Sequence, residues 1–377
     1  MAVANTEVKY YRSTDSGAPT LSGEAGKLIN VLDGLIAGYG QVTLDSLVVA
    51  SDVATGTLST GHGFVMVGGT VGPVILIAGA TPSSLNGEWR IATVPGSTTF
   101  TFVTEGISDQ TATGTITAKI APAGRTKVYS GTNLAAYQCD DPTGNQFFHY
   151  IDDTNATNAR FRGYESMTSI SSGTNPFPTD AQQSGGLYFY KSSAASSATR
   201  PWIAILDQHL IYLFADGANN SAWNGFLLFG DGNSYKANDA YACLVLGAVT
   251  AGNDTYFYSL NTVQGSYTAR SYTQVGTSIA TGRTSHGRMN YIGYTTGGNP
   301  VLPSPVDNNA HVWPVEFYEN AGPGRGLMPG LWCPVHNGGI SHGTLISDIA
   351  NLPDHVLMCH KTAGSYYPAM DISGPWR

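Results

Sequence analysis

The amino-acid sequence predicts a mostly β protein: a large antiparallel β-sandwich-like domain with one N-terminal helix, interrupted by a small inserted β-barrel or sandwich module. Three observations predict this class. The 46 glycines and 19 prolines among 377 residues indicate many turns. The 21 tyrosines and the low charged fraction of 12% indicate broad sheets with polar but uncharged outer faces. Helical periodicity is convincing in a single segment.

That helix is predicted near the N-terminus, over residues 23–37. Ser22 suits the N-cap, Glu24 falls in the first turn, where the helix dipole favours a carboxylate, and Gly38 suits the C-terminal stop. The preceding polar stretch "YYRSTDSGAP" is expected at the surface. Apolar residues recur at spacings of three, four and seven and form one stripe: Leu21, Ala25, Leu28, Leu32, Leu35 and Ile36.

A change of composition marks the predicted module. From residue 43 to residue 119 the chain is rich in Val, Thr, Gly and Ala, and short strand signals follow one another. Such a run of strands is enough for a small barrel or sandwich. We therefore predict an N-terminal segment and helix at 1–42, an inserted β module at 43–119 and the remainder of the main β-rich domain at 120–377.

The centre of the module reads as a hairpin. The stretch "SLNGEWRIATVPGSTTFTFVTE" (84–105) has turn dipeptides at Asn86-Gly87 and at Pro95-Gly96, and its second half alternates threonine with aromatic or branched residues. His62 lies between two glycines. We interpret it as a turn-capping side chain rather than a ligand.

Several stretches resemble structural proteins of tailed bacteriophages. "GHGF", "VGG", "IAGATPSSLNGEWRIATV" and "TFTFVT", in this order within 58–117, look like a small β module found repeatedly in such proteins. The flanking stretches are similar to virion and tail structural proteins of these phages, in which the helix leads almost directly into the "GTN" strand. The resemblance thus implies that the module is an insertion. The flanking stretches are residues 8–40, 129–138, 159–179, 191–214 and 370–377.

The C-terminal part reads as a long succession of strands. "RPWIAILD" and "HLIYLFADG" predict a hairpin. "LFADG" (213–217) and "LFGDG" (228–232) each end a strand in an Asp-Gly turn. A calcium site is the alternative, but these loops lack the alternating carboxylates that such sites use.

Bulk properties exclude several classes of partner. A net charge of −8 disfavours a protein that neutralises phosphates, so we expect no nucleic acid. The longest apolar run, "VGPVILIAGA", is about half as long as a membrane span. The first residues lack the apolar core of a signal peptide. We expect the four widely spaced cysteines to be reduced in a bacterial or viral cytoplasm.

The stretch "GISHG" formally matches the nucleophile elbow G-x-S-x-G around Ser341. The elbow needs a strand before it and a helix after it, whereas a turn-rich loop precedes this serine. The acid and histidine candidates follow too closely for the hydrolase fold. We therefore interpret the stretch as a Gly-rich loop; the candidates are Asp348, Asp354, His355 and His360.

A zinc site is the more serious alternative. Cys-x-x-His followed by His-x-x-x-Cys has the spacing of zinc ligands. However, "HVLMCHK" also reads as a strand, in which Cys359 and His360 point to opposite sides. We expect packing and loop residues here, and no bound metal. The set consists of Cys333, His336, His342, His355, Cys359 and His360.

Other catalytic patterns are weak. Asp140-Asp141 and Asp152-Asp153 are adjacent pairs, which more often mark turns than glycosidase sites. The many tyrosines suit protein interfaces and sugar stacking equally. We therefore expect no catalytic residues, no cofactor and no enzymatic activity.

The expected function is that of a structural subunit of a tailed-phage virion, in the tail or baseplate, which acts by symmetric self-association and contacts with other virion proteins. It would be made in the bacterial host cytoplasm. Two alternatives stay open: a capsid decoration or head-fibre protein, and a tail protein that binds or depolymerises a host surface glycan. Since chain ends lie at domain surfaces, we expect docking through Tyr10, Tyr11, Arg12, Trp376 and Arg377, away from the insertion.

Overall fold

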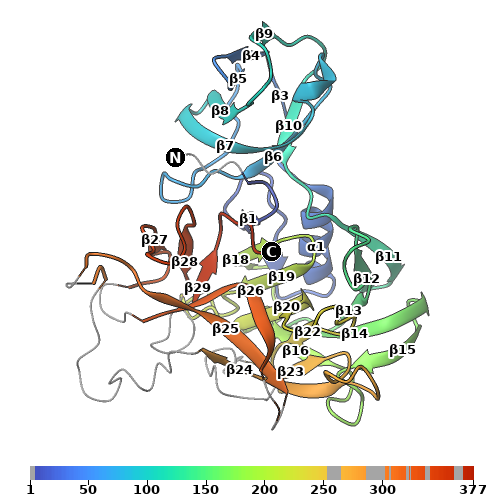
Figure 1. The fold of residues 1–377 in the computed structure, drawn as a ribbon. Coiled ribbons are helices and arrows are strands. Elements are labelled where there is room, and N and C mark those ends of the chain that lie inside the picture. The colour runs from blue at the N-terminus through green and yellow to red at the C-terminus, as the bar shows by residue number, and fades with distance from the viewer. Residues whose placement is uncertain are drawn as a thin grey trace.

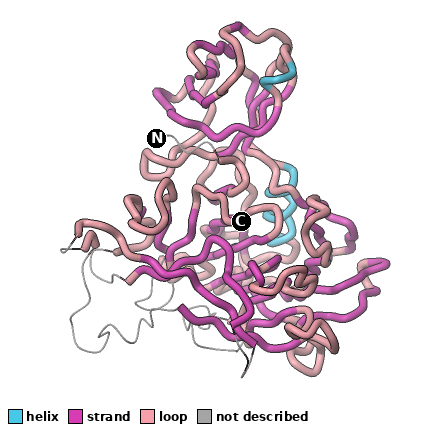
Figure 2. The backbone as a smooth tube through the Cα atoms, in the orientation of Figure 1, coloured by secondary structure: helices cyan, strands magenta, loops and turns pink. Residues whose placement is uncertain are grey.

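The computed structural model describes residues 5–252, 265–285, 302–304, 307–319, 322, 324–335, 340–360 and 368–377. In these ranges the chain is mostly β, as predicted, with one α-helix, α1 (Lys27–Ala37), and one 3₁₀ turn, η1 (Ser83–Leu85). Figure 2 shows strands throughout the molecule and the helix near its middle. No helix in the described ranges is long and apolar enough to cross a membrane.

The largest sheet holds thirteen of the described strands and includes segments from both ends of the chain (Figure 1). The predicted hairpin is present as β18 and β19, which pair from Trp202 with Ala215 to Leu206 with Ile211. In spatial order the strands are β1 (Lys9–Arg12), β18 (Trp202–Leu206), β19 (Leu210–Ala215), β20 (Gly225–Asp231), β22 (Cys243–Leu246), β23 (Ser266–Thr268), β24 (Ile279–Ser285), β25 (Val312–Glu319), β26 (Gly324–Pro334), β29 (Ala369–Asp371), β28 (Leu357–Cys359) and β27 (Leu345–Ile346), with β21 (Asn233–Ser234) beside β26.

The central strands of this sheet are buried on both faces. Ile211 and Leu213 of β19 belong to a core cluster that also contains helix α1. Tyr212 and Phe214 belong to a second cluster, shared with Met370 near the C-terminus. Burial on both faces explains why these strands are continuous apolar runs. The expectation of polar outer faces is therefore wrong for the centre of this sheet.

A six-stranded sheet lies beside helix α1, and a two-stranded sheet ties the chain before the helix to the chain before β18. Tyr137 Oη donates a hydrogen bond to Asp33 Oδ1 on the helix at 2.9 Å. The six-stranded sheet consists of β11 (Arg125–Gly131), β12 (Leu134–Cys139), β13 (Phe148–Asp152), β14 (Asn158–Ser169), β15 (Ser172–Phe177) and β16 (Leu187–Tyr190), and the small sheet of β2 (Leu21–Ser22) and β17 (Thr199–Arg200).

The helix begins at Lys27, later than the predicted start at residue 23. Ser22 is not its cap, because β2 pairs with β17 and draws Ser22 into a strand. Glu24 also lies before the helix, where it accepts a hydrogen bond from Ser22 Oγ. Gly38 ends the helix with a φ of 69°, as predicted for the stop.

The cap of the helix comes from a distant part of the chain. Asp153 Oδ2 accepts hydrogen bonds from the backbone N–H groups of Leu28 at 2.7 Å and Ile29 at 3.2 Å. Gly26, with a φ of 78°, donates its N–H to the carbonyl oxygen of Asp153 at 2.9 Å. A carboxylate at this end satisfies helix donors that would otherwise be orphaned. Sequence periodicity does not reveal a cap that lies so far along the chain.

A separate eight-stranded sheet is built from strands between Val42 and Ile120 and lies at the top of Figure 1. The predicted hairpin is present, but its turn is at residues 97–98 rather than at Pro95-Gly96. Its strands, in spatial order, are β3 (Val42–Thr43), β10 (Thr117–Ile120), β6 (Val74–Ala78), β7 (Gly87–Gly96), β8 (Thr99–Val103), β5 (Val53–Thr57), β4 (Ser46–Ala50) and β9 (Gln110–Thr111).

Two turn predictions in this segment have different outcomes. Asn86-Gly87 does not form a tight hairpin turn. Instead, the Asn86 side chain closes a longer loop by bonding the N–H of Ala80 at 2.8 Å and its carbonyl oxygen at 2.9 Å. His62 is a turn cap, as predicted: its Nδ1 accepts from the N–H of Phe64 at 2.9 Å, and its Nε2 bonds the carbonyl oxygen of Gly96 at 3.0 Å.

The eight-stranded sheet holds the N-terminal segment. Buried Arg90 of β7 donates to the carbonyl oxygens of Asn5 at 2.6 Å, Val8 at 2.5 Å and Gly72 at 2.9 Å. Lys9 Nζ pairs with Glu88 Oε1 at 2.7 Å. The expectation that the insertion lies away from the N-terminal segment is therefore wrong. The division into domains stays a prediction.

We expect a variant that joins residue 42 to residue 120 through a short Gly-Ser linker to stay folded, because the helix cap and the β1–β18 pairing remain. Its N-terminal segment should fray, since Arg90 and Glu88 are lost. Circular dichroism and hydrogen–deuterium exchange measure the two effects. Near-native spectra are expected, with faster exchange in the segment that precedes β1. Loss of folding would contradict the prediction and make residues 43–119 part of the core.

Candidate functional site

A polar cleft of about 540 Å³ lies where the six-stranded sheet, the large sheet and the C-terminus meet. An adjoining hollow of about 490 Å³ shares Thr143, Asn145 and Asp239 with it. Acidic side chains dominate the walls. The residues that line the cleft are Glu7, Asp141, Thr143, Asn145, Asp207, Gln208, His209, Asp231, Gly232, Asp239 and Arg377.

His209 lies at the tip of the β18–β19 hairpin, and Asp207 places it there. Asp207 Oδ1 accepts the N–H groups of His209 at 2.9 Å and Leu210 at 2.6 Å. An aspartate that bonds the backbone two residues later forms a tight Asx turn. The turn directs the imidazole toward the loop 140–147.

The imidazole of His209 bridges two carboxylates from different sheets. Its Nε2 lies 3.1 Å from Asp141 Oδ2, and its Nδ1 lies 3.5 Å from Asp231 Oδ2. Asn145 also holds Asp231, through its backbone N–H at 2.9 Å and its amide nitrogen at 3.1 Å. A Cβ atom on Gly144 would lie 2.7 Å from His209 Nδ1, so this close approach requires glycine.

These contacts shift the pKa values of His209, Asp141 and Asp231. The hydrogen bond to Asp231 raises the pKa of His209 above its usual range, although burial opposes the shift. Hydrogen bonds from Thr143, and then from His209, lower the pKa of Asp141. Burial alone would raise the pKa of Asp231, but the bonds from His209 and Asn145 outweigh it and lower the pKa. The cluster is therefore an imidazolium held between two carboxylates at mildly acidic pH.

Arg377, one of the predicted docking residues, closes one side of the cleft. Its Nε lies 2.8 Å from Asp207 Oδ2, its Nη1 donates to Asn233 Oδ1 at 2.7 Å, and its Nη2 donates to the carbonyl oxygen of Asp231 at 2.5 Å. Trp376 is only 8% exposed and meets Tyr212 edge to face at 5.8 Å. Both residues thus hold the C-terminus in the fold.

The three N-terminal docking candidates are also engaged internally. Tyr10 and Tyr11 are buried in β1, and Tyr11 Oη donates to the carbonyl oxygen of Ala121 at 3.0 Å. Arg12 is half-buried and pairs with Asp15 at 2.8 Å. The expected surface position is wrong for Tyr10, Tyr11 and Trp376, because these aromatic side chains gain more by completing the core than a surface position would allow.

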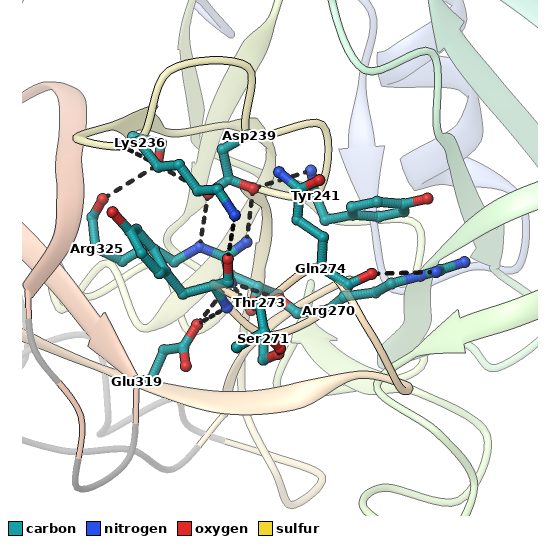
Figure 3. Close-up of polar contacts among 12 residues, drawn as sticks. Lys236, Asp239, Tyr241, Arg270, Ser271, Thr273, Gln274, Glu319 and Arg325 are labelled. Carbon is teal, nitrogen blue, oxygen red and sulfur yellow. Dashed lines mark hydrogen bonds and ion pairs between the residues drawn. The ribbon is translucent and has the colours of Figure 1, made fainter.

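A buried ion-pair network holds Asp239, which lines the cleft (Figure 3). Fully buried Arg325 of β26 forks onto the two carboxylate oxygens of Asp239, each at 3.0 Å, and also reaches Glu319 at 3.2 Å. Lys236 Nζ donates to the carbonyl oxygen of Tyr272 at 2.7 Å. A bidentate, desolvated pair of this kind is strong and directional. It fixes the position of the cleft-lining loop after β21.

The aromatic side chains at the adjoining hollow are covered on their faces. The guanidinium of Arg270 lies 4.2 Å from the ring centre of Tyr241, and Phe147 stacks on the same residue at 6.0 Å. Arg270 is in turn held by Glu165, with Nη2 and Oε2 2.6 Å apart. Sugar stacking needs an open ring face. The contacts around Tyr241 favour a structural role for this residue instead.

Ser341 lies in a turn before β27, and no helix follows it among the described residues of that segment. Its N–H donates to Thr344 Oγ1 at 2.9 Å, and the two hydroxyl groups are 3.1 Å apart. His355 bonds Asp371 Oδ2 at 2.7 Å rather than the serine. The geometry is that of a turn, not of a nucleophile elbow.

The zinc candidates are divided between separate clusters. Cys333 packs in the cluster that contains Val356 and Met358, whereas Cys359 packs in the cluster that contains Leu357. The predicted alternation along this strand is confirmed. His336 lies outside the described residues.

The remaining two candidates, His342 and His360, contact aromatic rings. His360 lies 3.9 Å from Phe214 and 5.0 Å from His342 between ring centres. No group of three His, Cys, Asp or Glu residues within the described ranges has the arrangement of a metal site.

The adjacent aspartates mark turns, as predicted, with two additions that the sequence did not indicate. Asp152 caps the turn at Thr154, and Asp141 caps the turn at Thr143. Asp141 also reaches His209, and Asp153 caps helix α1. Sequence reasoning missed His209 and Asp207 as well. Only the pattern Asp-x-His, which is typical of an Asx turn, was available as a signal.

Replacement of His209 by glutamine tests the bridge. A raised folded-state pKa means that the stabilisation is fully present below the unfolded value of about 6.5 and is lost as pH rises through the folded value. We expect His209→Gln to lower the free energy of unfolding by about 1 kcal/mol near pH 5.5, and by less near pH 9. Denaturant titrations measure both.

The matched control for this variant is His311→Gln. The pair of His311 with Asp307 is 45% and 37% exposed, so its loss should change stability little at either pH. An effect of His209→Gln that is equal at both pH values would show that the charge bridge contributes nothing.

No family model matches this chain, and no curated protein matches it significantly. A proposal about its function therefore rests on its residues and their geometry.

Proposed function

We propose that this chain is a non-enzymatic structural subunit of a tailed-phage virion, located in the tail or baseplate, that assembles with copies of itself and with other virion proteins. One observation carries the proposal. The stretches that resemble phage virion proteins lie far apart in the sequence, yet they contact one another and form a single framework around helix α1 and strands β18–β19 (Figure 1).

Three contacts join this framework. Trp202 Nε1 donates to the carbonyl oxygen of Pro19 at 2.9 Å, which links the stretches 191–214 and 8–40. Tyr137 bonds Asp33, which links 129–138 to the same helix. Trp376 packs on Tyr212 and so adds the C-terminal stretch. The stretches that resemble phage proteins are thus joined in one core. This supports the proposal more than a resemblance between separate surface loops would.

The cleft supports a structural role over a catalytic one. Each carboxylate of the His209 cluster already accepts hydrogen bonds from neighbouring protein groups. The pKa values of Asp141 and Asp231 are lowered, whereas the general acid of a glycosidase needs a raised pKa. The depolymerising alternative therefore has less support than a subunit whose polar groups hold sheets together.

Composition of purified particles tests the location. In a phage that encodes this chain, we expect the protein in virions at a copy number that matches a rotational symmetry of the tail, because ring contacts repeat around a closed axis. Quantitative mass spectrometry of particles and a cryo-electron microscopy map measure this. Density on the capsid shell would favour the decoration or head-fibre alternative. Absence from the virion would refute the proposal.

Self-association should depend on exposed aromatic side chains. Trp313 on β25 is 44% exposed, and tryptophan is a frequent interface anchor. We expect Trp313→Ala to weaken the assembly by about 2 kcal/mol, roughly 30-fold in Kd. Light scattering over a dilution series measures it, with Val65→Ala, in the exposed loop between β5 and β6, as control. An assembly unaffected by Trp313→Ala would place the contact elsewhere.

A further inference from the structure

A lysine and an aspartate meet in the interior, where neither side chain is exposed. Lys191, directly after β16, pairs through its Nζ with Asp153 Oδ1, and both side chains have 0% exposure. The two residues are 38 positions apart in the chain. Within the described residues, Lys191 Nζ has one other hydrogen-bond acceptor, the carbonyl oxygen of Glu24 at 2.7 Å.

The other carboxylate oxygen faces the N-terminus of helix α1. Asp153 Oδ2 accepts the N–H groups of Leu28 and Ile29, at 2.7 and 3.2 Å. Two backbone donors on one oxygen, backed by the helix dipole, withdraw electron density from the carboxyl carbon. They also stabilise negative charge that develops on that oxygen during attack by a nucleophile. The amine of Lys191 lies beside the other oxygen of the same carboxylate, Oδ1.

We propose that Lys191 and Asp153 condense into an intramolecular amide, an isopeptide bond that links the end of β16 to the residue after β13. The proposal concerns a covalent modification of the chain and is independent of the proposed virion role.

The step needs no external reactant. A proton passes from the Lys191 ammonium to the Asp153 carboxylate, which leaves a neutral amine and a carboxylic acid. The Nζ lone pair attacks the carboxyl carbon and forms the Nζ–Cγ bond, and negative charge develops on Oδ2. The Cγ–Oδ1 bond then breaks, and Oδ1 leaves as water with the carboxyl proton and one amine proton. No atom is oxidised or reduced.

The surroundings suit the product as well as the reactants. After condensation, Oδ2 is the amide oxygen and can keep its two backbone donors, while the single remaining N–H on Nζ can keep the carbonyl oxygen of Glu24. No buried polar group loses its partner.

The pKa shifts of Asp153 and Lys191 also favour the condensation. Burial raises the pKa of Asp153, against the opposing effect of Lys191, and burial lowers the pKa of Lys191. Both shifts move the pair toward the neutral amine and acid that the step requires.

The chain contains a matched control pair. Lys127 Nζ lies 2.5 Å from Asp33 Oδ2, but these side chains are 30% and 33% exposed. Water keeps such a pair charged, and a protonated amine has no lone pair for attack. We expect this second pair to stay unlinked.

Mass spectrometry of the full chain tests the proposal. The denatured protein should be lighter than its sequence by the mass of one water molecule, and the Lys191→Arg variant, which keeps the charge but lacks the amine, should have its full sequence mass. Trypsin does not cleave after an acylated lysine, so the wild-type digest should contain a branched peptide that joins Asp153 to Lys191.

A full sequence mass for the wild-type chain, or a water loss that persists in Lys191→Arg, would overturn the proposal. If the variant does not fold, the wild-type peptide map decides by itself: a linked Asp153–Lys191 peptide supports the bond, and separate linear peptides refute it. A linked Asp33–Lys127 peptide would refute the role assigned to burial.

Discussion

The buried carboxylate of Asp153 is the contact on which three parts of the fold depend. Asp153 directly follows β13 in the chain. Its carboxylate caps helix α1 and pairs with Lys191, which directly follows β16. Removing one partner of a fully buried ion pair leaves an uncompensated charge, which costs about 3–5 kcal/mol. The helix, the six-stranded sheet and the chain leading into β18 therefore have one compatible arrangement around this group.

The same principle, that buried polar groups must find partners, governs the ends of the chain. The N-terminal segment is held by Arg90, whose guanidinium bonds three carbonyl oxygens, and β1 pairs with β18. The C-terminus is held by Arg377 and Trp376. Both termini thus complete the large sheet and its core. The aromatic side chains of Tyr10, Tyr11 and Trp376 are therefore buried, whereas Trp313 of β25 is exposed.

The polar cleft follows from this arrangement. Where the six-stranded sheet meets the hairpin β18–β19, two turns and the end of β20 bring Asp141, Asp207 and Asp231 together around His209. Mutual repulsion is relieved because the imidazolium and Arg377 lie among the carboxylates. The result is a clasp between sheets. The Arg325–Asp239 ion pair holds the loop after β21, which lines the same cleft through Asp239.

Local patterns in the sequence determined the β class, the existence of helix α1, its stop at Gly38, the β18–β19 hairpin, the cap at His62 and the alternation that separates Cys359 from His360. Each depends on residues close together in the chain, where periodicity and turn chemistry act. The start of the helix, the burial of Tyr10, Tyr11 and Trp376, the clasp at His209 and the pairing of Asp153 with Lys191 were decided by the tertiary structure alone. They join residues far apart in sequence, and a carboxylate carries no local sign of which distant donor will desolvate and pair with it.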